Sequence, residues 1–518
     1  KIANLRIKII MSDYLSFLLG IVPLAVLIFM ILKMKSAVHH AVLVSLIITV
    51  ALAIFHWNNT LQFASVSVLY GAVKGLWPII IVILAAIYSY NLMLKTGGME
   101  VLKDVLAGIS DDKRVQVLLI SWGFGGFLEA VAGYGTAVAI PIGILIALGF
   151  DPFKAAVASL VANTVPTAFG AVGIPVSILA QNTGLDVLVL SKTIIIQLGL
   201  FNILLPFVIV AIAGGGIKAI KGVGFITLMC GISTLIPQYI VAANLGAELP
   251  AFAGSLVSLI VVIFLAKRMK TGHDKSKQPT KHSAKELLVA SSIYLFTFIF
   301  ILACSPLFPT IQTAVGTIAT KIPFVLSDTQ TEYQTIAWLS TPGVLIILAS
   351  FVGGTIQGAS LSTLFSVLVK TTIQLKNSII AIMAIVAMAT VMDFSGMIGS
   401  IAETLVNFTG AGFIFIAPVI GALGTFVTGS DTNSNVLFGK LQTSAAAKLH
   451  VDPFILAAAN TSGATGGKMI SPQSIAIAVS ATKMDGQSSA IMRETLKYCI
   501  AYIIILGAKI GIIYHLMN

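Results

Sequence analysis

The sequence predicts an all-α membrane protein that crosses the lipid bilayer many times. Of its 518 residues, 57% are hydrophobic and only 10% are charged, whereas about 25% of the residues in a soluble domain are charged. Apolar runs recur along the chain, each long enough to cross the ~30 Å hydrocarbon layer as a helix. The alternating segments of about ten residues that are typical of an outer-membrane barrel are absent from the sequence. The clearest apolar runs are 14–32, 37–55, 77–94, 187–213, 251–266, 287–303 and 378–391.

The charged residues gather outside these runs. The formal net charge is +12, and the densest cluster is segment 267–285, with seven Lys or Arg residues and one Asp. Because this segment separates two apolar runs, the positive-inside rule predicts a cytoplasmic loop. This distribution of positive charge argues against a nucleic-acid partner. We expect membrane lipid to surround the apolar runs. We therefore expect an N-terminal extension at 1–10, before a plausible natural start at Met11. We expect three further parts after this extension: a first transmembrane half at 11–266, the basic loop at 267–285 and a second transmembrane half at 286–518.

The two halves contain an internal repeat. Each has a glycine-rich polar segment, then an apolar stretch, then Asp-Pro-Phe, then Ala-Asn-Thr close to a Gly- and Pro-rich stretch. The Asp-Pro-Phe motifs begin at Asp151 and Asp452. Internal repeats, often inverted, are typical of secondary transporters, whose sites form where helices break near the middle of the membrane. We expect two such repeats with broken or re-entrant helices.

Prolines and glycines mark where the helices are expected to break. Proline removes a backbone hydrogen-bond donor, and glycine lets other groups approach the backbone closely. An open polar backbone is tolerated in a membrane only inside the protein or along a wet cavity. A single glycine is better explained by close helix packing, but a cluster mixed with Asn, Thr and Glu indicates a cavity. The prolines are Pro141, Pro166, Pro175, Pro418 and Pro472, and the glycines are Gly123, Gly125, Gly126, Gly133 and Gly135.

Three carboxylates stand alone in apolar sequence. Glu129 is the only charged residue between 115 and 150, Asp393 between 377 and 402, and Asp431 between 404 and 439. Each costs roughly 2.5–3.5 kcal/mol at the middle of a membrane, so such residues normally face a cavity and mark ion or proton paths. Burial makes a carboxyl group hold its proton more tightly. Glu129, Asp431 and Asp393 are therefore candidates for proton coupling, and the alternative for Glu129 is a neutral, hydrogen-bonded structural acid.

The apolar runs contain no arginine, so a bound carboxylate would not meet the bidentate partner that suits it best. The groups that could bind the carboxylate instead are helix N-termini, backbone N–H groups and hydroxyl groups. Lys440 or Lys468 could supply the counter-charge. The alternative for each is a lysine at a helix end whose side chain reaches toward the membrane surface. The candidates for substrate binding are Gly133, Tyr134, Gly135, Thr136, Asn163, Thr164, Ser430, Thr432, Asn433, Ser434, Asn435, Lys440, Asn460, Thr461, Ser462 and Lys468.

Motifs for enzymatic chemistry are missing. The segment GATGGKM resembles a phosphate-binding loop, but its glycines have the wrong spacing and Met469 stands where Ser or Thr is required. The histidines and cysteines form no metal-binding pattern, and no GxSxG motif is present. We expect no catalytic residues, no metal and no cofactor.

Three blocks of sequence resemble the L-lactate permease family. They are SWGFGGFLEAVAGYGTAVAIPIGILIALGFDPFKAA at 121–156, GALGTFVTGSDTNSNVLFGKLQ at 421–442 and AANTSGATGGKMISPQSIAIA at 458–478. The similarity extends from Tyr14 over nearly all of the following chain. The resemblance implies a protein of the bacterial cytoplasmic membrane with about 12–14 transmembrane helices. It also implies uptake of L-lactate, and of D-lactate or glycolate, together with a proton.

This implied function agrees with the charges. Lactate is an anion at neutral pH, as a carboxyl pKa near 4 indicates, and an interior-negative potential opposes its uptake by about 2.3 kcal/mol per 100 mV. A proton carried with it removes that cost. The hypothesis is that Glu129, or alternatively Asp431, takes the proton while lactate binds where the repeats meet. The alternatives are a sodium-coupled carboxylate carrier using Asp431 and its neighbours, a channel, and a membrane-embedded enzyme.

Overall fold

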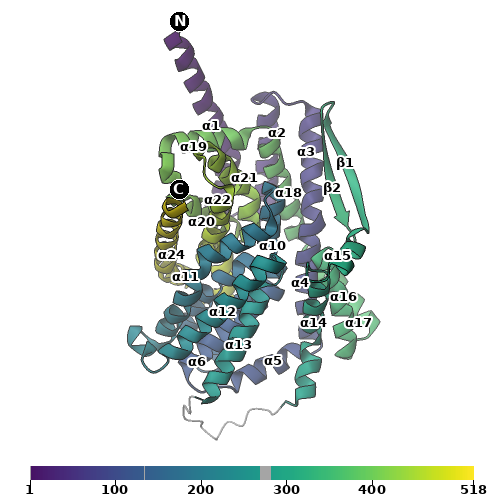
Figure 1. Ribbon diagram of the computed structural model, residues 1–518, viewed down its shortest axis with the longest axis vertical. Helices are drawn as coiled ribbons and strands as arrows, with labels where there is room; N and C mark the ends of the chain where they lie inside the picture. Colours follow the sequence, from purple (N-terminus) through teal and green to yellow (C-terminus); the bar gives the residue numbers. More distant parts are fainter. Residues whose placement is uncertain (1, 134, 269–281, 518) are drawn as a thin grey trace.

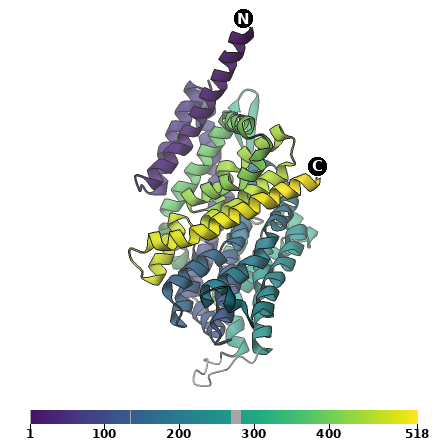
Figure 2. The same ribbon diagram turned by 90° about the vertical axis from the view of Figure 1, so that its left-hand side faces the viewer.

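The computed structural model describes residues 2–133, 135–268 and 282–517. Tyr134 and most of the expected basic loop, 269–281, lie outside the described residues. Figures 1 and 2 show an elongated bundle in which long helices run at different tilts. Among the described residues, ten helices are long and apolar enough to cross a membrane, or eleven if one pair bent by 47° is counted as a single span. The prediction of a helical, multi-pass membrane protein is confirmed.

The helices of the first half follow one another closely. They are α1 (Ile2–Leu32), α2 (Val38–Phe55), α3 (Leu61–Lys74), η1 (Gly75–Ile80), α4 (Ile81–Lys95), α5 (Gly98–Ala107), α6 (Lys113–Val117), η2 (Leu118–Phe124), α7 (Gly125–Val131), α8 (Thr136–Ala147), α9 (Pro152–Ala162), η3 (Val165–Phe169), α10 (Gly170–Thr183), α11 (Val187–Gly214), η4 (Ile217–Ile220), α12 (Gly224–Leu245) and α13 (Pro250–Arg268).

The second half adds one small sheet. Its elements are α14 (Ala284–Ala303), α15 (Pro309–Gly316), β1 (Ala319–Ser327), β2 (Gln330–Ala337), α16 (Pro342–Ile356), α17 (Leu361–Gln374), α18 (Lys376–Phe394), α19 (Met397–Thr409), η5 (Gly410–Gly412), α20 (Phe413–Thr428), α21 (Asp431–Leu449), α22 (Pro453–Lys468), α23 (Pro472–Thr482) and α24 (Ser488–Met517).

The expected repeat is visible in the order of the elements. In each half, a helical hairpin is followed by Asp-Pro-Phe, by a helix that breaks in its middle, and by one long helix. The hairpins are α6 to α8 and α20 to α21, and the broken helices are α9 with α10 and α22 with α23. The repeated motif has a local cause. The carboxylates of Asp151 and Asp452 accept hydrogen bonds from backbone N–H groups of the helix that follows, and proline takes its first position.

The two repeats point in opposite directions. The open end of the first hairpin, at α6, lies at the lower end of the molecule in Figure 1, whereas the second hairpin opens near α19 at the upper end. There Lys448 of α21 pairs with Glu403 of α19 at 2.9 Å. The packing is reciprocal, because α8 contacts α23 and α10 contacts α21. Each hairpin therefore packs its second arm against the second part of the other repeat's broken helix.

The apolar residues divide between an interior and a lipid-facing surface. The largest buried cluster surrounds the first hairpin and the broken helices and includes Leu128, Val161 and Leu456. Large apolar side chains are also exposed along α12 and α24, such as Ile240 and Ile504. Exposed apolar stripes of this kind suit contact with lipid tails, and backbone polar groups are paired within the helices.

The hairpin of β1 and β2 was not expected from the sequence. The strands are antiparallel, with Ala319 opposite Ala337, and β1 packs against α3. The side chains of Phe324 and Leu326 are buried, whereas that of Val325 between them is exposed. This alternation is the strand signal, but it covers a short stretch between two much stronger helical patterns.

Candidate functional site

All four interruptions of the repeats open onto one cavity of about 300 Å³. The tip of the first hairpin contributes Gly133 and Gly135, and the tip of the second contributes segment 428–433. The break of the first broken helix contributes Thr167, Gly170 and Ala171, and the break of the second contributes Lys468 and segment 472–474. Residues 300 positions apart in the sequence therefore form one site, as expected for repeats that meet near the middle of a membrane.

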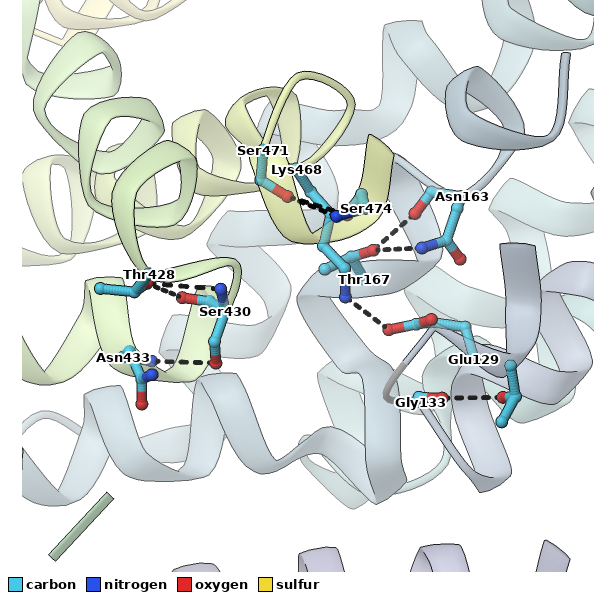
Figure 3. Close-up of polar contacts among 11 residues, drawn as sticks. Glu129, Gly133, Asn163, Thr167, Thr428, Ser430, Asn433, Lys468, Ser471 and Ser474 are labelled. Atoms are coloured by element: carbon cyan, nitrogen blue, oxygen red, sulfur yellow. Dashed lines mark hydrogen bonds and ion pairs between the residues drawn. The ribbon is translucent and has the colours of Figure 1, made fainter. Parts of the chain in front are cut away.

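A buried ion pair forms part of the cavity wall. The Nζ atom of Lys468, the last residue of α22, lies 3.3 Å from Oε1 of Glu129 on α7. Figure 3 shows the lysine side chain pointing from the second repeat toward the carboxylate of the first. The side chain of Glu129 is 3% exposed and that of Lys468 is 13% exposed. A pair so well removed from water is strongly coupled, because little solvent screens it.

The position of Glu129 depends on a glycine opposite to it. A Cβ atom on Gly170 would lie 2.6 Å from Oε1 of Glu129, which is too close for a real contact. The second oxygen of this carboxylate, Oε2, is buried and has no hydrogen-bond partner among the described residues. A buried oxygen without a hydrogen-bond donor is costly. The Glu129 side chain is therefore held by its ion pair with Lys468 and by close packing against Gly170, and not by hydrogen bonds to both carboxylate oxygens.

A second buried carboxylate lines the same cavity. Asp431 is the first residue of α21 and is 2% exposed. Neither of its oxygens has a hydrogen-bond partner among the described residues. It interacts electrostatically with both Lys468 and Glu129. Lys468 is the only Lys or Arg among the described residues that line the cavity, so one cation serves two carboxyl groups.

The helices α8, α21 and α23 each begin at the cavity. The N-cap residues are Gly135 for α8, Ser430 for α21 and Ser471 for α23, and residues of each helix start or its cap line the cavity. The N-terminus of a helix carries a partial positive charge and unpaired N–H groups. These helix ends favour an anion in the cavity, as phosphate and carboxylate groups at helix N-termini do elsewhere.

Hydroxyl groups hold the interrupted backbone in place. Ser430 accepts from the N–H of Asn433 at 3.3 Å, and Thr428 accepts from the N–H of Ser430 at 3.3 Å. In the first break, Thr167 donates to the carbonyl of Asn163 at 2.5 Å. Figure 3 shows these contacts around the ion pair. The interrupted backbone is thus held by side-chain hydrogen bonds, and Thr167, Thr428, Ser430 and Asn433 line the cavity.

The backbone of the first break adopts an unusual conformation. Ala171, Val172 and Gly173 have φ values of 43°, 59° and 72°. A left-handed conformation is unfavourable for a β-branched residue such as Val172. Strain of this kind persists only where the surroundings enforce it, and it gathers at functional sites.

Comparison with known proteins assigns nearly the whole chain to the family that its sequence resembles. The model of the family described as L-lactate permease matches residues 16–517. The L-lactate permease of Streptococcus iniae is 44% identical over 441 residues, covering 85% of this chain and 93% of that protein. The glycolate permease GlcA of Escherichia coli K12 is 34% identical over 534 residues, covering 95% and 94% of the two chains.

The chain belongs to the L-lactate permease family. The L-lactate permease of Escherichia coli K12 is 33% identical over 525 residues, with 95% of each chain covered. Among solved structures, the crystal structure of the YdaH transporter of Alcanivorax borkumensis covers 86% of both chains with a TM-score of 0.42 and 12% identity. This structural likeness is too remote to support an argument about the site.

In this member of the L-lactate permease family, eight of the residues predicted from the sequence line the cavity. The two proton-coupling candidates there are Glu129 and Asp431. The substrate-binding candidates there are Gly133, Gly135, Ser430, Thr432, Asn433 and Lys468. Their roles stay predictions. Tyr134, between the two glycines of the first hairpin tip, lies outside the described residues.

The remaining candidates support the site or lie away from it. Thr136 donates to the carbonyl of Gly133 at 2.7 Å, and Ser434 to that of Gly421 at 2.7 Å. Asn435 donates to the carbonyl of Pro175 at 3.0 Å, which connects the two repeats. Asn460 donates to Oδ1 of Asn435 at 2.9 Å. Buried residues of the broken helices that do not line the cavity are Asn163, Thr164, Thr461 and Ser462.

Asp393 and Lys440 form a separate pair. The Nζ atom of Lys440 lies 3.7 Å from Oδ2 of Asp393, and both side chains are partly exposed. Neither residue lines the cavity. Of the two lysines that the sequence left as equal candidates for a counter-charge, the structure places only Lys468 beside the cavity.

Sequence reasoning missed several residues of the cavity wall. Thr428, Thr167, Gly170, Gln473 and Ser474 line the cavity but were not among the candidates. Gln473 and Ser474 belong to the segment SPQS, where Ser471 caps α23 and proline follows it. A Ser-Pro pair that restarts a helix after a glycine-rich stretch is a usable sequence signal. For Thr167 and Gly170, only the three-dimensional arrangement shows the contact.

The contact between Gly170 and Glu129 gives a testable prediction. Gly170 has φ −66° and ψ 160°, which alanine adopts without strain. The change Gly170→Ala should therefore act through its methyl group, which displaces the Glu129 carboxylate. We expect L-lactate uptake by reconstituted protein to fall about 10- to 100-fold, as for other small misplacements of a functional group.

The matched control is Gly143→Ala in α8, where a Cβ atom would meet nothing within 4 Å. This variant should transport like the unchanged protein. Both variants should keep the same elution volume in size-exclusion chromatography. Equal uptake by the two variants would show that the position of Glu129 does not matter for transport.

Proposed function

We propose that this protein imports L-lactate, together with glycolate and D-lactate, across the bacterial cytoplasmic membrane by symport with a proton. The relatives named as L-lactate and glycolate permeases support the substrate class. The observation that carries the coupling is the buried ion pair of Glu129 and Lys468 at the cavity where the two repeats meet.

The first step of the mechanism is competition for Lys468. An incoming lactate anion needs a cation, and Lys468 is the only Lys or Arg among the described residues that line the cavity. In the structure its ammonium group is paired with Glu129. Protonation of Glu129 removes the negative charge of this competitor. The ammonium group is then free to bind the carboxylate of lactate, and the helix N-termini of α8, α21 and α23 add their partial positive charges.

The second step follows from the total charge. With both carboxyl groups ionised, the charges of Glu129, Asp431 and Lys468 sum to minus one. A lactate anion alone would make the cavity more negative in a medium of low dielectric constant, which is strongly unfavourable. A proton that enters with lactate leaves the charge unchanged. Binding of lactate without a proton is therefore disfavoured, and this is the basis of the coupling.

Release reverses these steps on the cytoplasmic side. When the proton leaves Glu129, its carboxylate competes again for Lys468 and displaces lactate. The movement of one proton with one lactate anion is electroneutral, so the membrane potential does not oppose uptake. Without the proton, the potential would oppose it by about 2.3 kcal/mol per 100 mV.

The test is uptake of labelled L-lactate into proteoliposomes. The exterior is made more acidic than the interior, and the membrane potential is held at zero with potassium and valinomycin. We expect transient accumulation above the external concentration, and none when the pH gradient is absent. The same vesicles with a sodium gradient and no pH gradient test the alternative in which Na⁺ is bound through oxygen ligands of Asp431, Thr432, Asn433 and Ser434.

The outcomes separate the possibilities. Accumulation driven by sodium alone would replace the proton mechanism with the sodium alternative. Equilibration without accumulation under either gradient would indicate a facilitator or channel. Unlabelled glycolate and D-lactate should inhibit uptake of the labelled substrate, whereas the neutral amide of lactate should not, because it lacks the charge that Lys468 binds.

A further inference from the structure

A second polar cavity lies on the other side of α10. Its volume is about 450 Å³. One wall is formed by Tyr70, Lys74 and Trp77 of α3 and η1, and the opposite wall by residues of α10. The loop between α12 and α13 contributes Glu248, and strand β2 contributes Gln334. Nothing in the mechanism above uses this cavity.

A thin partition separates this cavity from the central one. Ile174 lines both cavities, Val172 lines the second and Ala171 the central one. The partition is therefore the strained left-handed segment of the first break. A Cβ atom on Gly173 would lie 2.0 Å from the carbonyl oxygen of Ala247. The backbone of the loop between α12 and α13 therefore packs directly against Gly173 in the partition.

The second cavity lies toward the side of the membrane opposite to the basic loop. α13 begins at Pro250, beside Glu248, and ends at Arg268, where the basic segment begins. α13 is long and apolar enough to cross the membrane, and the positive-inside rule puts its basic end in the cytoplasm. Glu248 and the cavity that it lines are then nearer to the exterior.

Lys74 is the cation of this cavity. Among the described residues, no carboxylate lies within 4.0 Å of its Nζ atom. The charged groups that act on it from neighbouring elements are Asp393 and Lys440, which pair with each other, and Glu332 of β2. Its ammonium group lies 6.0 Å from the centre of the Tyr70 ring. An ammonium group without an ion-pair partner beside a polar cavity is suited to bind an anion.

The other polar groups of the cavity are compatible with this role. Ser177 and Gln181 stand four residues apart on α10, so they lie on the same face of the helix. They offer a hydroxyl and an amide group for the hydroxyl group of a 2-hydroxy acid. Burial raises the pKa of the Glu248 carboxyl above its ordinary value.

We propose that this cavity is an outer binding site for the small carboxylate substrate, with Lys74 as its counter-charge and the segment around Val172 and Ile174 as the partition to the central site. The proposal rests on the proposed function, because the same class of substrate is to occupy both cavities. The substrate binds first near the exterior and then passes the partition to reach Lys468.

Trp77 supplies a local probe, because it lines the outer cavity. The chain has four tryptophans, and a variant in which Trp57, Trp122 and Trp338 are replaced by Phe keeps only Trp77. Lys468→Met is added to remove the central site, together with Glu129→Gln so that no unpaired buried charge is left. L-lactate is titrated into this protein in lipid nanodiscs while Trp77 fluorescence is recorded. We expect a saturable change with L-lactate and none with its neutral amide.

Replacement of Lys74 tests the counter-charge. In the same background, Lys74→Met should raise the apparent Kd for L-lactate roughly tenfold or more, because it removes a charged hydrogen-bond donor. Lys74→Arg should keep binding, and so should the control Lys321→Met on the exposed face of β1. No saturable change with L-lactate, or an equal change in the Lys74→Met protein, would overturn the proposal.

The titration is independent of transport. If the unchanged protein accumulates L-lactate but Trp77 does not respond, the outer site is wrong and the proposed function stands. If Trp77 responds and the response needs Lys74, but no gradient drives uptake, the outer site stands and the coupled transport is wrong.

Discussion

Replacement of Lys468 by Met is expected to abolish accumulation of L-lactate. Lys468 supplies the positive charge of the central cavity and holds the Glu129 carboxylate at 3.3 Å. Loss of one partner of a buried, hydrogen-bonded charge pair costs about 2–5 kcal/mol, which corresponds to a loss in binding of roughly 30-fold or more. We expect the initial rate of labelled L-lactate uptake at low substrate concentration to fall by at least this factor.

A control distinguishes the site from general loss of positive charge. Lys448, also in the second repeat, forms its ion pair with Glu403 at the surface, and both side chains are about half exposed. Exposed pairs contribute little to stability, so Lys448→Met should transport like the unchanged protein. Equal uptake by Lys468→Met and Lys448→Met would contradict the proposed role of Lys468.

Folding of the Lys468 variant needs a separate check. Removal of the lysine leaves Glu129 buried without its partner, and an uncompensated buried charge can destabilise a protein by about 3–5 kcal/mol. The double variant Glu129→Gln with Lys468→Met removes both charges. If the double variant restores the melting temperature but not L-lactate binding, the loss of transport belongs to the missing counter-charge and not to misfolding.

The large features of this fold follow from local sequence patterns. Apolar runs predict most of the membrane-spanning helices, and the repeated Asp-Pro-Phe predicts two equivalent helix starts, because Asp caps the helix and proline occupies its first position. The glycines of GATGGK illustrate the limit. A Cβ atom on Gly463 would lie 1.9 Å from the carbonyl oxygen of Pro418. This glycine permits close packing of α22 on α20, a fact that depends on a partner 45 positions away in the chain.

The site could be predicted in part for a similar reason. Glu129 and Asp431 are visible in the sequence because single acids in apolar surroundings are costly. Their partner is not visible, since Glu129 and Lys468 are 339 residues apart. Lys440 has similar surroundings in the sequence, yet its side chain pairs with Asp393 outside the cavity. The partner of each lysine lies on an element distant in the sequence, α7 for Lys468 and α18 for Lys440.

Replacement of Glu129 by Gln is expected to separate lactate movement from proton movement. Glutamine has nearly the same shape as protonated glutamic acid, so the carboxylate that competes for Lys468 is removed permanently. Lactate should still bind and should exchange with lactate on the other side of the membrane. A pH gradient should no longer drive accumulation, because residue 129 has no proton to carry.

Two measurements on the same proteoliposomes show this separation. Exchange of labelled for unlabelled L-lactate should stay within about threefold of the unchanged protein, while accumulation driven by an acidic exterior should disappear. In the unchanged protein the apparent affinity for lactate should increase as the external pH falls, since protonation of Glu129 frees Lys468. In the Glu129→Gln protein this dependence should be absent, because the competing charge is missing at every pH.

Asp431→Asn is the decisive comparison, because Asp431 is the second buried carboxylate of the same cavity and interacts electrostatically with Lys468 and Glu129. If Glu129 carries the proton, the Asp431→Asn protein should still accumulate L-lactate under a pH gradient. If accumulation instead survives in Glu129→Gln and is lost in Asp431→Asn, with exchange intact, the proton carrier is Asp431. Glu129 would then serve only as the fixed partner that positions Lys468. Loss of accumulation and retention of exchange in both variants would mean that the two carboxyl groups share the proton across the interface between the repeats.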